Sequence, residues 1–141
     1  MTGGGFHFIH QLRVRWSEVD RQGVVFNGHY LDYFDVAMTE YLRGIGFPYP
    51  QGLIENGTDL YLKKAGIEYL GAVGYDDLLE IHTRVARIGN SSLTFEFEVR
   101  RKGEETRLVT GQNVYVNVNL ETRKAAPIPA ELAGAIEKRE E

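Results

Sequence analysis

The chain has 141 residues, with 20 Asp and Glu against 16 Lys and Arg, and a formal net charge of −4. This length fits one domain of ordinary size, and the acidic balance argues against nucleic-acid binding through bulk charge. Cysteine is absent, which excludes disulfides, thiolate metal ligands and thiol catalysis. No apolar run approaches the ~18 residues of a membrane span, and the N-terminus does not resemble a signal peptide, so we expect a cytoplasmic protein.

The first third of the chain predicts a strand, a loop and one long helix. Apolar and polar residues alternate over 8–16, which indicates a half-buried strand. Polar residues and a glycine over 17–23 indicate a loop. Apolar residues spaced three and four apart then predict an amphipathic helix from about 28 to 43. Asn27 is its expected N-cap, because a side-chain oxygen there can accept an unpaired backbone N–H.

The rest of the chain is dominated by β patterns. A loop is expected around 51–58. Alternating segments over 60–69, 78–88, 93–99 and 109–120 then predict four strands, and a short helix is expected over 129–138. Strands that follow one another through short turns indicate an antiparallel sheet. A single long helix cannot cover both faces and both edges of a five-stranded sheet, so we expect self-association.

The segment between the first strand and the helix is the candidate site. Asp20 stands seven residues before Asn27, and the residues just before Asn27 are apolar. The first turn of a helix offers unpaired N–H groups and partial positive charge, which stabilise an oxyanion. A carboxylate close to it can act as a nucleophile or as a general base. Spacing alone favours the ordinary alternative, a loop aspartate followed by a simple helix cap.

The pattern Asp20-x-x-Gly23-x-Val25-x-Asn27-x-x-Tyr30, followed by an aromatic amphipathic helix, resembles the signature of the 4-hydroxybenzoyl-CoA thioesterase-like family. These are the hotdog-fold acyl-CoA thioesterases that include the YbgC-type enzymes. The resemblance extends over roughly residues 8–130, through the segments 65–70, 75–79, 88–93 and 127–129.

This resemblance implies an α+β hotdog fold, in which a curled antiparallel β-sheet wraps around one long central α-helix. The domain would span 8–130, between a flexible segment over 1–7 and a helical tail over 131–141. The family assembles as dimers or tetramers, which agrees with the self-association expected from the incompletely covered sheet.

The implied reaction is hydrolysis of an acyl-CoA to a free acid and CoA, and no metal or redox cofactor is expected. Asp20 matches the catalytic carboxylate, as nucleophile or general base. The backbone N–H of Asn27 matches the group that polarises the thioester carbonyl. Gly28, His29 and Tyr30 follow in the motif, and we expect them to contact the substrate.

Two further sets of residues are candidates for substrate binding. Arg87, with the turn residues Asn90 and Ser91, is a candidate for binding the phosphates of CoA; a solvated sheet edge explains the same residues. Asp59 is a candidate contribution from a partner chain, and the alternative is an ordinary loop aspartate.

Two other functions remain open on the sequence alone. A hotdog dehydratase would require an acid–base pair, such as Asp with His in a hydratase-like segment, and this pair is not found. A non-catalytic acyl-thioester-binding protein would keep the fold and the basic residues but would not need a carboxylate before the helix. Asp20 therefore favours the thioesterase.

Overall fold

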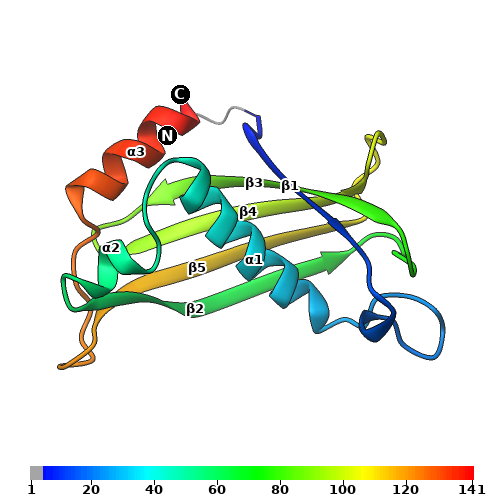
Figure 1. The fold of residues 1–141 in the computed structure, drawn as a ribbon, viewed down its shortest axis with the longest axis horizontal. Helices are drawn as coiled ribbons and strands as arrows, with labels where there is room; N and C mark the ends of the chain where they lie inside the picture. The colour runs from blue at the N-terminus through cyan, green and yellow to red at the C-terminus, as the bar shows by residue number, and fades with distance from the viewer. Residues whose placement is uncertain (1–4) are drawn as a thin grey trace.

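The computed structural model describes residues 5–141 and contains one five-stranded sheet with a long helix across one face (Figure 1). The strands and helices are β1 Phe8–Arg13, α1 His29–Gly44, α2 Gln51–Ile54, β2 Thr58–Tyr69, β3 Leu78–Ile88, β4 Ser92–Arg101, β5 Val109–Asn119 and α3 Ala130–Glu140. The sheet is antiparallel throughout, with strand order β1-β3-β4-β5-β2. The predicted long helix and the four later strands are confirmed, and so is the α+β hotdog fold.

Three local predictions were wrong. The first strand ends at Arg13 rather than at residue 16, because the backbone leaves the sheet into a 3₁₀ turn at Trp16–Glu18, and Trp16 is 75% exposed. The N-cap of α1 is Gly28 rather than Asn27, and no side chain caps the helix. The segment 51–54, expected as loop, forms the short helix α2.

The core lies between α1 and the sheet. Alternate residues of β4, among them Phe95 and Phe97, are buried under the helix, and the ring of Phe97 stacks on Phe34 of α1 at 4.4 Å between centroids. Gly111 of β5 lies beneath the same ring, and a Cβ at this position would stand 2.3 Å from Phe34. Glycine is therefore required here for the helix to pack this closely on the sheet.

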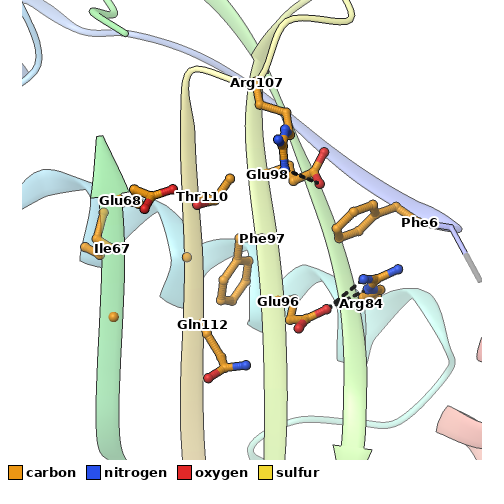
Figure 2. A pocket seen from close by; sticks show the side chains of 12 residues that line it. Phe6, Ile67, Glu68, Arg84, Glu96, Phe97, Glu98, Arg107, Thr110 and Gln112 are labelled. Atoms are coloured by element: carbon orange, nitrogen blue, oxygen red, sulfur yellow. Dashed lines mark hydrogen bonds and ion pairs between the residues drawn. The ribbon is translucent and has the colours of Figure 1, made fainter. Parts of the chain in front are cut away.

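The opposite face of the sheet carries charged residues. Glu96 and Glu98 alternate with the buried phenylalanines of β4 and so point away from α1. Arg84 pairs with Glu96 at 2.8 Å, and Arg107 lies 3.9 Å from Glu98 (Figure 2). A shallow pocket of about 470 Å³ lies on this face. The mixture of both charges is that of a solvated surface.

Both ends of the described chain pack against the sheet. Phe6 lies over the guanidinium of Arg84, 4.5 Å from it, while residues 1–4 of the predicted flexible segment lie outside the described residues. At the other end, Leu132 and Ile136 of α3 are fully buried. The boundaries proposed for the domain stay a prediction. Among residues 5–141, no helix is long and apolar enough to cross a membrane.

Candidate active site

Asp20 lies in a tight hairpin that connects β1 to α1. Phe26 N–H donates to the Glu18 carbonyl at 2.9 Å, and Asp20 N–H donates to the Val24 carbonyl at 2.9 Å. The hairpin closes at Gly23, whose φ of +78° is a left-handed conformation that favours glycine. Val25 is buried, and its N–H donates to the Val73 carbonyl at 2.8 Å, so the hairpin is anchored to the body of the protein.

The carboxylate of Asp20 is half-buried beside a cavity. Its Oδ1 accepts a hydrogen bond from the N–H of Gln22 at 2.8 Å. Across the described chain, no protein donor is found for Oδ2. The cavity has a volume of about 670 Å³ and is lined in part by the rings of Trp16 and Tyr75, which meet edge to face at 5.6 Å. One carboxylate oxygen is thus fixed by the turn while the other is available for chemistry.

The start of α1 presents an unpaired N–H at Asn27. The carbonyl of Phe26 accepts the N–H of His29 at 3.0 Å and so points toward the helix. In a planar trans peptide the N–H points opposite to the carbonyl, so the Asn27 N–H is directed away from the helix. Within residues 5–141 it has no acceptor. This is the orientation that an oxyanion donor requires.

The neighbouring peptide and Tyr30 are held by β2. The carbonyl of Asn27 accepts the hydroxyl of Tyr69 at 3.1 Å, and the rings of Tyr69 and Tyr30 meet at 5.6 Å. Tyr30 is buried, which together with the nearby Tyr69 hydroxyl raises the pKa of Tyr30 to about 12. Asn27 and Tyr30 line a cavity of about 280 Å³ with Tyr69 and the 70–73 segment.

His29 lies on the other side of the helix start. Its Nδ1 is 3.2 Å from Asp32 Oδ2, and it lines a third cavity, of about 520 Å³, between α1 and β1. Gly28, the observed N-cap, lies between His29 and Asn27 in the chain. The predicted motif residues are therefore held in one loop and helix turn, but in the single chain they do not line one shared cavity.

Asp59 is not brought near Asp20 by the fold of one chain. It lies at the start of β2, where its Oδ1 accepts the N–H of Leu60 at 2.8 Å and the hydroxyl of Tyr49 at 3.3 Å. Tyr69, at the other end of β2, is the residue that reaches Asn27. Ten residues of strand at ~3.3 Å each place Asp59 roughly 30 Å from the helix start. A contribution to the site from a partner chain stays a prediction.

Arg87, Asn90 and Ser91 lie at the same distant end of the sheet. The opposite end of β3 adjoins the Asp20 hairpin, since Val14 N–H donates to the Asp77 carbonyl just before β3 begins. The carbonyls of Asn90 and Ser91 accept the N–H groups of Ile128 and Asn117, so this turn holds the C-terminal segment. Their predicted role in phosphate binding would therefore also require a second chain.

Glu18 is a candidate residue that no sequence pattern predicted. A glutamate in a polar loop predicts solvent exposure, yet Glu18 is buried and accepts the hydroxyl of Tyr33, which lies in α1, at 2.9 Å. Only its position two residues before Asp20 could have indicated a role. No group of three or more His, Asp or Glu suited to a metal ion is present in the part of the chain that the structure describes.

Comparison with known proteins identifies the family. The sequence model of the Thioesterase-like superfamily matches residues 14–136. The chain is 32% identical to the acyl-CoA thioesterase YbgC of Haemophilus influenzae over 136 residues, which cover 96% of each chain. A crystal structure of an Aquifex aeolicus protein superposes with a TM-score of 0.83 at 29% identity, covering 92% of this chain and 98% of that one.

A second solved structure extends the likeness in fold. The 1,4-dihydroxy-2-naphthoyl-CoA thioesterase of Synechocystis superposes with a TM-score of 0.86 over 98% of this chain and 99% of that chain. At 22% identity this match supports the shared architecture alone. The family match over most of the chain, together with the full-length relative from Haemophilus influenzae, shows that this protein belongs to the thioesterase-like superfamily.

Proposed function

We propose that this protein hydrolyses acyl-CoA thioesters to a free acid and CoA, with Asp20 as the reacting carboxylate and the Asn27 N–H as the oxyanion donor. Membership of the thioesterase-like superfamily makes it a thioester hydrolase. The acyl-CoA substrate is supported by the name of the full-length relative from Haemophilus influenzae. The observation that carries the mechanism is a carboxylate with one free oxygen on the hairpin that leads into a helix start with a free N–H.

Two routes are compatible with this geometry. As a nucleophile, Asp20 adds to the thioester carbonyl, the C–S bond breaks, and CoA leaves as the thiolate, which takes up a proton. Water then hydrolyses the resulting anhydride and regenerates the carboxylate. As a general base, Asp20 takes a proton from water, whose oxygen attacks the carbonyl directly; the C–S bond then breaks, and CoA leaves as the thiolate, which takes up a proton. In both routes negative charge develops on the carbonyl oxygen, where the Asn27 N–H would stabilise it.

Self-association is part of the proposal. β2 is an edge strand, and residues 61–69 are mostly exposed in the single chain. Exposed strand edges are sites of pairing with another chain. A partner chain paired there, in a dimer or tetramer, would lie next to Tyr69 and Asn27. It is the source we expect for the groups that complete the site, Asp59 among them.

The first test is Asp20→Asn with a panel of acyl-CoA esters and detection of the free thiol. The amide is nearly isosteric with the carboxylate but is neither an anionic nucleophile nor a base. We expect kcat to fall at least ~100-fold, equivalent to about 2.7 kcal/mol of barrier, with the circular dichroism spectrum unchanged. A folded variant that retains more than about a tenth of the wild-type kcat, within ~1.4 kcal/mol, would show that Asp20 is not the reacting group.

A further inference from the structure

The Glu18 carboxylate is buried and has every oxygen occupied. Its Oε1 accepts the Tyr33 hydroxyl at 2.9 Å and the Arg15 backbone N–H at 2.8 Å. Its Oε2 accepts the Nε and Nη2 groups of Arg15 at 3.0 and 2.8 Å. Only 8% of the Glu18 side chain is exposed. A carboxylate in a short surface loop is normally solvated, so a buried and fully bonded one calls for an explanation.

Glu18 stays ionised despite its burial. Burial alone raises the pKa of its carboxyl, but the hydrogen bonds from Arg15 and Tyr33 outweigh it and hold the pKa below the ordinary value. Burial and the adjacent carboxylate raise the pKa of Tyr33, so its hydroxyl remains a donor at neutral pH. The contact is thus a charge-assisted hydrogen bond, a kind that is stronger than a neutral one.

The same residue is tied to α1 in two ways. Its side chain bonds to Tyr33, one turn into the helix. Its backbone carbonyl accepts the N–H of Phe26, whose own carbonyl accepts the N–H of His29 at the helix start. Asp20 follows Glu18 by two residues, and Asn27 follows Phe26 directly. Hydrogen bonds made by Glu18 therefore connect the loop segments that carry both proposed reacting groups to the start of α1.

We propose that Glu18 is a positioning residue, whose bond to Tyr33 fixes the Asp20 carboxylate relative to the Asn27 N–H. The inference rests on the function proposed above. Catalytic groups must be held within a fraction of an ångström of their working geometry, and a displacement of 1 Å costs on the order of 100-fold in rate. Glu18 does not line the Asp20 cavity, and with Tyr33 and His29 it lines the third cavity, between α1 and β1, so it acts on Asp20 through the loop.

The sharpest variant is Tyr33→Phe, which removes one oxygen atom and leaves Glu18 paired with Arg15. We expect kcat for an acyl-CoA ester to fall about 10- to 100-fold while KM changes less than about threefold, because the loss falls on positioning in the transition state. Glu18→Gln should act in the same direction. The double variant should be little worse than either single variant, since both substitutions act on the same contact: one removes the donor and the other removes the charge of the acceptor.

The chain offers a matched control at the far end of the same helix. Tyr41 donates to the buried carboxylate of Glu140 at 2.5 Å, and neither residue lines a cavity at the Asp20 hairpin. Tyr41→Phe also removes one hydroxyl bonded to a buried glutamate. We expect it to lower the melting temperature while kcat stays within about twofold of wild type, since it is far from the chemistry.

A second readout does not depend on activity. Hydrogen exchange followed by NMR should show the amides of Asp20 and Phe26 exchanging at least ~10-fold faster in Tyr33→Phe, with the β3 and β4 amides unchanged.

Full activity in Asp20→Asn would refute the proposed function, whereas faster loop exchange would still support the link through Glu18. Folded Tyr33→Phe and Glu18→Gln variants with kcat within twofold of wild type and unchanged loop exchange would overturn the proposal.

Discussion

Two glutamates are buried against tyrosines of α1, one toward each end of the helix, and they differ in what they connect. Glu18 bonds to Tyr33 across 15 positions of sequence and takes its ionic partner, Arg15, from its own turn. Glu140 bonds to Tyr41 across 99 positions. It also accepts the N–H of Val85 at 3.0 Å, where the β3–β4 register shifts. The glutamate–tyrosine pair of Glu18 therefore holds a short loop against α1. The pair of Glu140 joins three elements that are distant in the sequence, α1, β3 and α3.

This difference in sequence separation predicts a difference in consequence. Glu140 joins α1, β3 and α3, which are far apart in the sequence, so it should contribute mainly to global stability. A contact within a loop and the adjoining helix can open locally while the sheet stays intact. Glu18 should therefore influence the geometry of the loop more than the unfolding of the protein.

The largest effect is expected from the helix start itself. Asn27→Pro deletes the backbone N–H, whereas Asn27→Ala keeps it, so the first should lower kcat by ~10²–10³ and the second by much less. Steady-state assays of both variants with one acyl-CoA ester measure this ratio, and circular dichroism confirms that each is folded. Equal rates in the two variants would exclude the main-chain N–H as the oxyanion donor.

The next largest effect is a loss of stability on substitution of Glu140. In the native protein the Tyr41 hydroxyl and the Val85 N–H both donate to one carboxylate oxygen of Glu140. Glu140→Gln replaces this carboxylate with an amide, and it should lower the free energy of unfolding by about 1–3 kcal/mol. Urea denaturation measures this loss, and kcat should stay within about twofold of wild type. A drop in kcat without a loss of stability would reverse the roles assigned to the two glutamates.

The smallest effect is a pH dependence at Glu18. Its pKa is lowered in the folded protein, so its ionised form stabilises the fold above the ordinary glutamate value of ~4.3. That contribution is lost as the pH falls through the lowered value. The stability difference between wild type and Glu18→Gln should be constant from pH 7 to about 5 and shrink toward pH 3. Urea titrations across this range test it, and a difference that grows on acidification would contradict the assignment.

The sequence predicted the elements whose signals are local. The alternation in β4 and the three-and-four spacing in α1 each identify a buried face, because one element carries the whole pattern. The same rule failed at Trp16, where alternation continues but the chain turns away from the sheet. It also missed Gly28 as the helix cap, since a favourable capping side chain stands one position earlier, at Asn27.

Only part of the candidate site could be predicted from the sequence. Asp20 and Asn27 could be proposed because a loop aspartate and a helix start stand in one short segment that resembles a family motif, and the structure places both on the hairpin that leads into α1. The burial of Glu18 depends on Tyr33, a partner that no periodicity reveals. For Asp59 and Arg87, the strand direction decides which end of the sheet each residue reaches, and both lie at the end away from the hairpin.

The close packing of Phe34 over Gly111 has a consequence for changing what the enzyme accepts. Any side chain at position 111 must displace that ring, and with it the helix whose first turn carries Asn27. The spacing between helix and sheet is thus fixed by a residue with no side chain of its own. Substitutions that reshape the site for new substrates belong at Trp16 and Tyr75, which line the Asp20 cavity and are largely exposed in the single chain.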